Sequence, residues 1–374
     1  MNNGYPIVLI VHPGTLGDVL LAVEAIREIR KAFPAHHVVW VGQSEVGKYL
    51  LECEEVHEAI GIEGPFLSQL FSGPGHVDDR LKGLLQRCTH CVCWMANHDE
   101  MISNHLQSLG IGFIIQSPQS SELMGFHLEE RFMRTLRPWG IMADSHKKRR
   151  LLFQNISSNS ETEQLRNRFS FIDTPYIVLH PGSGSRHKCV TPSFMAAVAR
   201  GLRKRSGINL VILSGPADQC HVDNLLAEIP SGMTHLVSNQ SLSTVASVLR
   251  NAALYMGHDS GISHLAAGVG TPSIVLFGPT NSAYWAPRGD HVTVIHGPPC
   301  QCDDWEQVQQ CHQKPCLEVS VDLILQKAEA LIPVNGKSHI SDLKSQIHSN
   351  NRSPKFQTLD SGNLYPHSCL KCEI

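Results

Sequence analysis

Short apolar runs that break at glycine-bearing turns predict the strands of a parallel sheet. The first run, residues 7–11, is continuous and rich in β-branched side chains, which is typical of a strand buried on both faces. A turn over residues 12–18 follows, and apolar residues at helical spacing then predict a helix over residues 19–33 that ends before Pro34. Residues 38–41 predict a second strand. The chain therefore opens with a strand–helix–strand unit whose turn lies at the carboxyl edge of the sheet.

The pattern restarts in the second half of the chain. Residues 176–179 form an apolar run that breaks at His180-Pro181-Gly182, as the first run breaks at His12-Pro13-Gly14. Between these repeats the pattern is weaker and indicates strands at 91–94 and 112–115 and a helix at 128–136. After the second repeat, the pattern predicts helices at 192–205, 221–228, 243–251 and 321–331, and strands at 210–213, 234–237, 252–256, 273–277 and 292–295.

This arrangement predicts an α/β protein with two Rossmann-like domains that face each other across a cleft. We expect the first domain at residues 1–150 and the second at residues 170–334. Residues 335–374 are rich in Ser, Asn, His and Lys without periodicity, so we expect them to form a disordered tail.

Composition narrows the class of protein. With 374 residues, 42% hydrophobic and 17% charged, the chain can bury a substantial core. A net charge of −3 argues against nucleic acid as a partner, and the one basic run, residues 147–150, is interpreted as a solvated linker. Neither a signal peptide nor an apolar run of about 18 residues is present, so we predict a cytoplasmic protein whose 12 cysteines are reduced. Peripheral contact with a membrane stays compatible with this prediction.

Residues 259–272 are the strongest candidate for a ligand site. An apolar strand leads into Asp259, a short helix of small residues follows, and a second apolar strand comes after it. Polar groups at the carboxyl end of a strand lie where open α/β sheets bind ligands. Asp259 could instead serve only as a helix N-cap, but that role does not explain Gly261 or the small residues behind it, which permit close approach of backbone to a ligand.

Four segments together resemble the family 9 glycosyltransferases, the ADP-heptose:lipopolysaccharide heptosyltransferases. They are GDVLLAVEAIREIRKAFP, VLHPGSGSRHK, LSGPADQ and MGHDSGISHLAAGVGTPSIVLFGPT, and the resemblance extends over about residues 7–332. It implies a GT-B fold with the acceptor on the N-terminal domain and the sugar nucleotide on the C-terminal domain. It also implies an inverting transfer of heptose onto the inner core of lipopolysaccharide.

The resemblance assigns catalytic roles to Asp18 and Lys188. Asp18 matches the proposed general base of the family, which takes the proton from the attacking hydroxyl. Its alternative role is a helix N-cap, which contributes about 1 kcal/mol. Lys188 would offset the charge that develops on the departing ADP. The Trp-Pro pair that usually follows this lysine in the family is absent here, so Arg186 or His187 could share the same task.

Donor-binding roles fall on the same turns. By resemblance, Asp259 holds the hydroxyls of the donor sugar and Asp218 binds the ribose. His264 is either a phosphate or sugar contact or a buried structural histidine. The residues whose amides and hydroxyls we expect to bind the diphosphate are Ser183, Gly184, Ser185, Ser260 and Gly261.

A cysteine-bearing loop near the end of the second domain suggests a zinc site. It contains Cys300, Cys302, Cys311 and Cys316, with His312 among them. The one-residue spacing of Cys300 and Cys302 falls outside the Cys-x2-4-Cys consensus and the four-residue spacing of Cys311 and Cys316 is at its upper limit, so no metal is assigned and the question stays open. A further Cys-x2-Cys pair, Cys369 and Cys372, lies in the tail and is a weak signal.

The predicted function is a metal-independent heptosyltransferase that requires no cofactor and takes ADP-heptose as its donor. Its partners would be that donor and a lipid-linked oligosaccharide acceptor at the cytoplasmic face of the inner membrane. Two alternatives stay open: a transferase or epimerase that uses another nucleotide sugar, and a catalytically silent sugar-nucleotide-binding module. The presence of both Asp18 and Asp259 argues against the silent module. No motif between residues 42 and 139 identifies the acceptor, and the sequence does not indicate the oligomeric state.

Overall fold

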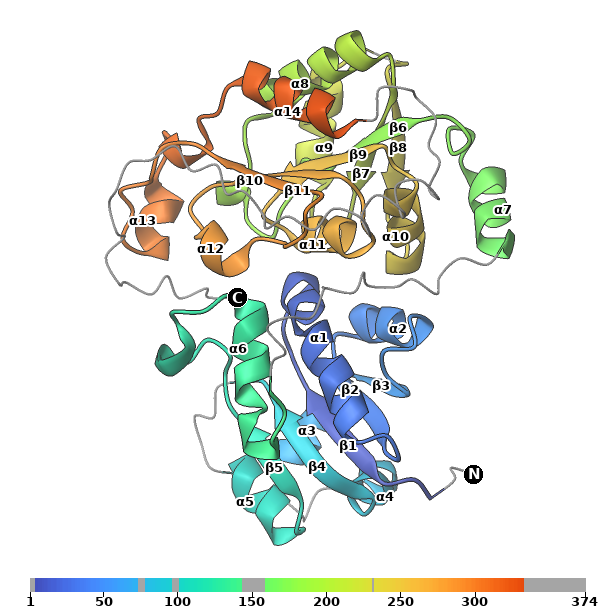
Figure 1. Ribbon diagram of the computed structural model, residues 1–374, viewed down its shortest axis with the longest axis vertical. Coiled ribbons are helices and arrows are strands. Elements are labelled where there is room, and N and C mark those ends of the chain that lie inside the picture. The colour runs from blue at the N-terminus through green and yellow to red at the C-terminus, as the bar shows by residue number, and fades with distance from the viewer. Residues whose placement is uncertain (1–3, 73–77, 96–100, 143–158, 231, 333–374) are drawn as a thin grey trace. The chain divides into compact units, whose positions relative to one another are not determined.

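Two parallel β-sheets form the framework of the computed structural model, which describes residues 4–72, 78–95, 101–142, 159–230 and 232–332 (Figure 1). The sheets belong to two compact units whose boundary falls between residues 157 and 158. Residues 241–243 group with the first unit. Each unit is therefore built around one sheet.

The first sheet has the strand order β3-β2-β1-β4-β5, and every neighbouring pair of strands is parallel. The central strand β1 (Ile7–Val11) is buried along its whole length, as its continuous apolar run predicts. The other strands are β2 (His37–Gly42), β3 (Glu58–Gly61), β4 (Cys88–Cys93) and β5 (Gly112–Ile115). The helices are α1 (Leu16–Ala32), α2 (Ser44–Glu52), α3 (Phe66–Ser72), α4 (Asp79–Leu85), α5 (Met101–Ser108) and α6 (Leu128–Thr135), with 3-10 turns η2 (Ser121–Leu123) and η3 (Arg137–Trp139).

The second sheet has the strand order β11-β10-β9-β6-β7-β8, and its neighbouring strands are also parallel. Its strands are β6 (Tyr176–Leu179), β7 (Asn209–Ser214), β8 (Thr234–Ser238), β9 (Leu254–His258), β10 (Ser273–Phe277) and β11 (Val292–His296). The helices are α7 (Asn159–Arg168), α8 (Pro192–Ser206), α9 (Gln219–Glu228), α10 (Leu242–Arg250), α11 (Gly261–Gly268), α12 (Ser282–Trp285), α13 (Trp305–Gln310) and α14 (Val321–Leu331), with 3-10 turns η4 (Arg186–Lys188) and η5 (Pro315–Leu317).

Strand β10 shows how the second core is divided between the two faces of its sheet. Ile274 and Leu276 belong to the main cluster, which also includes the apolar stripes of α8 and α14. Val275 and Phe277 point to the opposite face and pack with Ala286, next to α12. Figure 1 shows α8 and α14 side by side on one face of this sheet. A fully buried side chain of this kind stabilises the fold by about 1.5–3 kcal/mol relative to an exposed one.

Helix α8 illustrates how local signals set the bounds of an element. Thr191 is the N-cap and accepts a hydrogen bond from the Phe194 amide at 3.2 Å, and Pro192 occupies the first helical position. The helix ends at Ser206 and is capped by Gly207, whose φ of 69° is the left-handed conformation that glycine adopts without strain. The predicted range of 192–205 is therefore confirmed to within one residue.

Several short elements were not predicted. They lie where apolar periodicity is weak: α2, β3 and α3 to α5 in the first unit, and α7, α12 and α13 in the second. Helix α7, for example, is polar along most of its length. Residues 335–374, for which a disordered tail is predicted, lie outside the described part of the chain.

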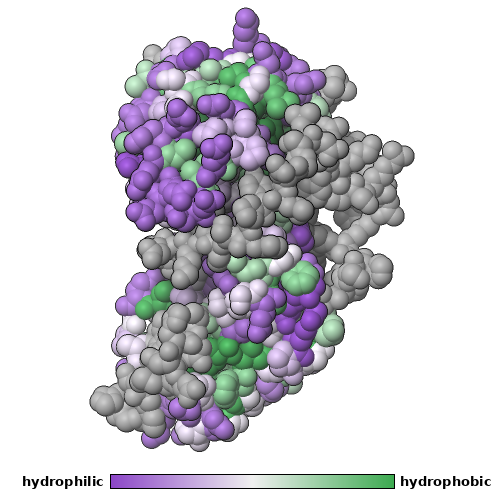
Figure 2. All heavy atoms as spheres, turned by 90° about the vertical axis from the view of Figure 1, so that its left-hand side faces the viewer, coloured by the Kyte–Doolittle hydropathy of each residue, from purple (hydrophilic) through white to green (hydrophobic). Residues whose placement is uncertain are grey.

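Six large hydrophobic side chains are exposed among the described residues. Figure 2 shows one face, on which hydrophilic residues alternate with smaller hydrophobic areas. The exposed large hydrophobic side chains belong to separate elements, and they are Tyr5, Leu51, Leu109, Met142, Leu236 and Leu323. None of the helices in the described residues combines the length and the apolar character that crossing a bilayer requires.

Candidate functional site

Adjacent strands β6 and β9 carry the two turns that the sequence marks as ligand-binding. They lie at the point where the order of the second sheet reverses, because β7 and β8 continue on one side and β10 and β11 on the other. The turn after β6 contains residues 180–188, and the turn after β9 begins at Asp259. Open α/β sheets bind ligands in the crevice at this switch point, outside the carboxyl ends of the strands.

Asp259 and Lys188 are in direct contact at this point. The Lys188 Nζ atom donates to Oδ2 of Asp259 at 2.8 Å, and the Thr280 hydroxyl donates to the same oxygen at 2.5 Å. The side chain of Asp259 is 9% exposed and that of Lys188 is 19% exposed, so the pair is only partly shielded from water. Lys188 also lies 5.9 Å from the centre of the Trp305 ring, within the range of a cation–π interaction. Lys188, predicted to contact the phosphates, and Asp259, predicted to contact the donor sugar, thus lie in one cluster.

The loop before Lys188 presents backbone donors to solvent. The amides of Ser183, Gly184 and Ser185 have no acceptor among the described residues, and Gly184 is exposed with open space around it. The Ser183 hydroxyl donates to the Asp259 carbonyl oxygen at 2.6 Å and so ties this loop to the turn after β9. Successive free amides beside a cation form a site suited to phosphate oxygens.

Helix α11 begins at the same place. Its N-cap is Ser260, whose hydroxyl accepts from the Ser263 amide at 3.4 Å. Asp259 is therefore not the N-cap of this helix, and its carboxylate is directed to Lys188 and Thr280 instead. The amide of Gly261 is in the first turn, where no intrahelical acceptor exists and the helix dipole favours an anion. His264 is 7% exposed and lies within the helix, so it is a buried histidine.

Asp218 is placed beneath the loop rather than on its surface. Its Oδ2 accepts from the Gly215 amide at 2.9 Å and lies 3.0 Å from Nε2 of His180. Burial raises the pKa of the Asp218 carboxyl, but the hydrogen bonds from His180 and from Gly215 outweigh it, so this pKa lies below its usual value. The contacts identify Asp218 as a brace of the His180 turn, while its assignment to the ribose stays a prediction.

Gly182 is required where the turn crosses Asp218. A Cβ atom on Gly182 would stand 1.8 Å from Oδ1 of Asp218, whereas a Cβ on Gly184 would meet nothing within 4 Å. We expect Gly182→Ala to lower the free energy of unfolding by about 1–3 kcal/mol, because the turn or the carboxylate must move. The matched variant Gly184→Ala should stay within about 0.5 kcal/mol of the wild type. Urea unfolding measures both, and equal values for the two variants would contradict this account of the turn.

A second buried histidine supports the far end of the same loop. His258 is fully buried at the end of β9, and its Nε2 accepts from the Val190 amide at 3.1 Å. Burial lowers the pKa of His258 to about 3, so the ring is neutral near pH 7 and can act as this acceptor. The segment that follows Lys188 is therefore anchored to the sheet.

Asp18 belongs to the first unit and lies in the first turn of α1. The prediction placed it just before the helix, but α1 begins at Leu16 with Thr15 as its N-cap, so Asp18 is the third helical residue. Its Oδ2 accepts from the Thr15 amide at 3.0 Å and from the Thr15 hydroxyl at 2.9 Å. Both bonds use the same oxygen, which leaves Oδ1 of this half-buried carboxylate without a donor in the described part of the chain.

The repeated His-Pro-Gly turns are structural counterparts. His12 follows β1 as His180 follows β6, and both rings are buried. The His12 ring packs 5.2 Å from Phe132 and 5.6 Å from Trp40, and its Nδ1 accepts from the Gly14 amide at 3.1 Å. Burial lowers the pKa of His12 to about 4, against the opposite effect of a hydrogen bond at the Asp18 backbone. A neutral histidine therefore shapes the turn that leads to Asp18.

The sequence did not mark three contributors to the site: Thr280, His180 and Trp305. Thr280 follows Gly278-Pro279 directly after β10, which is a polar turn at the same edge of the sheet and could have been recognised. Trp305 carried no signal, because α13 lies far along the chain from Lys188. Among the described residues, neither Asp18 nor Asp259 belongs to a group with the spacing of metal ligands.

Two solved structures share the arrangement of these sheets. The family 9 glycosyl transferase of Veillonella parvula has a TM-score of 0.70 at 17% sequence identity, covering 89% of this chain and 98% of that chain. The Escherichia coli ADP-heptose lipopolysaccharide heptosyltransferase II has a TM-score of 0.68 at 18% identity, covering 87% of this chain and 98% of that chain. With its two Rossmann-ordered parallel sheets, the chain is a protein of the GT-B fold, as predicted.

Sequence comparison identifies the family. Residues 134–316 match the model of glycosyltransferase family 9 (heptosyltransferase). The lipopolysaccharide heptosyltransferase 3 of Escherichia coli is 33% identical over 124 residues, which are 31% of this chain and only 35% of that protein. Residues 134–316 therefore form a glycosyltransferase family 9 region, and the resemblance seen in the motifs of this chain is confirmed.

Proposed function

We propose that the chain is a glycosyltransferase that moves heptose from ADP-heptose to a sugar hydroxyl of a lipopolysaccharide inner-core acceptor, with inversion at the anomeric carbon. One observation carries this proposal: Lys188, Asp259 and the free amides of residues 183–185 meet at the switch point of the second sheet. This arrangement offers a cation and amides to a diphosphate beside a carboxylate for sugar hydroxyls. The named activities of the relatives in the same family support the choice of sugar nucleotide.

The donor half of the mechanism belongs to the second unit. The amides of Ser183, Gly184 and Ser185 and those at the start of α11 bind the diphosphate of the donor. Lys188 exchanges part of its contact with Asp259 for the phosphate oxygens and offsets the charge that ADP acquires as it leaves. Asp259, held in place by Thr280, then accepts hydrogen bonds from hydroxyls of the heptose.

The chemical step is a single displacement. The acceptor hydroxyl oxygen forms a bond to the anomeric carbon while the bond from that carbon to the phosphate oxygen of ADP breaks, and ADP leaves with the electron pair. Oδ1 of Asp18, which has no protein donor among the described residues, takes the proton of the attacking hydroxyl. General-base catalysis of this kind contributes about 10²–10⁴-fold to the rate.

The acceptor would then bind the first unit. A lipid-linked oligosaccharide presents its sugars at a membrane surface, so we place the protein at the cytoplasmic face of the inner membrane. In this proposal Asp218 binds the ribose of the donor. It also positions the loop of residues 180–188 through its contact with His180.

Nucleotide preference tests the donor assignment. At a concentration about 100 times its dissociation constant, ADP should raise the free energy of unfolding by about 2.7 kcal/mol, because it binds only the native state. UDP and GDP at the same concentration should have much smaller effects. Stabilisation by UDP rather than ADP would replace the donor with another nucleotide sugar. Stabilisation by ADP without any transfer of heptose to inner-core acceptors would leave only a binding module.

A further inference from the structure

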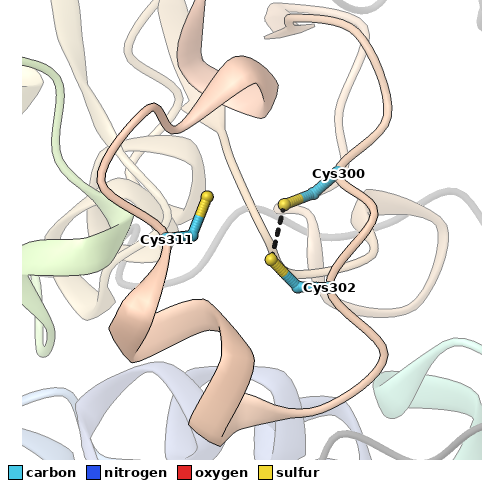
Figure 3. A group of neighbouring side chains, drawn as sticks. All are labelled: Cys300, Cys302 and Cys311. Carbon is cyan, nitrogen blue, oxygen red and sulfur yellow. Dashed lines mark hydrogen bonds between the residues drawn. The ribbon is translucent and has the colours of Figure 1, made fainter.

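The cysteine-bearing loop between β11 and α14 brings several thiols together (Figure 3). The sulfur atoms of Cys300, Cys302 and Cys311 all lie within 4.8 Å of one another, and those of Cys300 and Cys302 are 3.0 Å apart. Cys316 is buried in the same loop, close enough to Cys300 for each thiol to affect the pKa of the other, but it lies outside the group of three whose sulfur atoms are mutually within 4.8 Å. Figure 3 shows Cys300 and Cys302 on one arm of the loop and Cys311 on the other, with their sulfur atoms directed to a common point.

We propose that Cys300, Cys302, Cys311 and Cys316 bind a thiolate-preferring divalent metal ion such as Zn²⁺. Zinc–sulfur bonds of about 2.3 Å in a tetrahedron place the sulfur atoms about 3.8 Å apart, a separation that lies between the 3.0 Å of Cys300 and Cys302 and the 4.8 Å limit of the observed cluster. Binding the ion to four thiols releases four protons to solvent and leaves four thiolates around one divalent cation. Helix α13 lies between Cys302 and Cys311 in the sequence, and the sulfur atoms of these two residues nevertheless lie within 4.8 Å of each other.

The cysteine-bearing loop has few interactions of its own that would stabilise its conformation. From residue 297 to residue 317 it contains only the six-residue helix α13 and the three-residue turn η5, and few of its side chains are buried. Lys314 adopts a φ of 46°, which costs free energy for a residue other than glycine. A metal ion bound by four ligands supplies stability to a segment that lacks a hydrophobic core of its own.

Disulfide formation is the alternative explanation for the proximity of these thiols. Cys300 and Cys302 are separated by a single residue, and all ten cysteines in the described part of the chain are free. Three sulfur atoms around one point, with a fourth beside them, suit a metal ion better than a bond that joins sulfur atoms in pairs.

The metal loop also contacts the loop that carries Lys188. The Lys314 Nζ atom donates to the carbonyl oxygens of Arg186 at 2.8 Å and Cys189 at 3.3 Å, which flank Lys188. Trp305, at the start of α13, is the residue whose ring lies near Lys188 Nζ. Metal binding would therefore hold Lys314 and Trp305 in place beside Lys188. The metal site itself does not depend on the proposed activity.

The test is a metal titration of the full chain, purified under reducing conditions. We expect about one Zn²⁺ per chain by elemental analysis, or stoichiometric uptake of Co²⁺ with an intense thiolate-to-cobalt absorption band and the visible bands of a tetrahedral site. Cys302→Ser and Cys311→Ser should lose this band, whereas Cys220→Ser, at an exposed cysteine on α9, should retain it.

Circular dichroism shows whether each variant is folded, and the wild-type titration decides the matter even if a variant fails to fold. A wild-type protein that neither contains metal nor develops the cobalt–thiolate band overturns the proposal. So does a band that Cys302→Ser and Cys311→Ser leave unchanged. Mass spectrometry that finds these cysteines joined as disulfides in the native protein overturns it as well.

Discussion

Replacing Asp18 with Asn is expected to lower the turnover number for heptose transfer by about 10²–10⁴-fold, while the affinity for ADP stays within about threefold of the wild type. An amide cannot take the proton of the attacking hydroxyl at neutral pH. It nevertheless retains one oxygen that can accept from Thr15, as Oδ2 of Asp18 does, so the first turn of α1 should persist. Steady-state transfer kinetics and calorimetric titration with ADP measure the two quantities.

Thr15→Ala is the matched control for Asp18. It removes the hydroxyl bond to Oδ2 but leaves the carboxylate in place. We expect it to lower the free energy of unfolding by about 0.5–2 kcal/mol and to leave turnover close to the wild-type value. If Thr15→Ala slowed transfer as much as Asp18→Asn, Asp18 would be a helix cap rather than the base.

The second large effect concerns the pair of Lys188 and Asp259. Lys188→Ala should weaken the binding of ADP by about 10–100-fold, because a charged donor to phosphate is lost. Asp259→Ala should leave the affinity for ADP unchanged or slightly higher, since Lys188 is released from its 2.8 Å contact. Asp259→Ala should also lose the preference for ADP-heptose over ADP, because it lacks the carboxylate that we propose binds the heptose hydroxyls. Calorimetric titrations with both nucleotides separate these outcomes.

Arg186→Ala is the control for the position of the cation. Arg186 is exposed and lies two residues before Lys188 in η4, and its carbonyl oxygen accepts from Lys314. A loss of ADP affinity in Arg186→Ala that exceeds the loss in Lys188→Ala would transfer the phosphate role to Arg186. Wild-type affinity in Lys188→Ala would refute that role for Lys188.

The central strands were predictable because their apolar runs are continuous. Residues 7–11 and 273–277 coincide with β1 and β10, since a strand buried on both faces needs no partner information to be recognised. Helix α1 was predicted three residues late, because its first turn consists of Leu16, Gly17 and Asp18 and is held by a capping box rather than an apolar stripe. Local hydrogen bonds, not periodicity, decided that boundary.

The candidate site residues were also indicated in part by sequence motifs and decided in part by tertiary contacts. Sequence motifs singled out Lys188 and Asp259 separately, and parallel pairing of β6 with β9 explains why they can meet. Asp218 is predicted by resemblance to bind the ribose, and that role stays a prediction, whereas its contacts with Gly182 and His180 are not encoded by its own turn.

By itself, the sequence determined the two strand–turn–helix repeats, the turns that carry Asp18 and Asp259, and the resemblance to glycosyltransferase family 9. Only the tertiary structure decided that Lys188, Thr280 and Asp259 share one oxygen, and that the cysteine thiols converge although their spacing argued against it. The physical reason is the range of the forces. Hydrophobic periodicity and turn preferences act over a few neighbouring residues, whereas these side-chain contacts join elements far apart in sequence and form only when parallel strand order and helix packing bring them together.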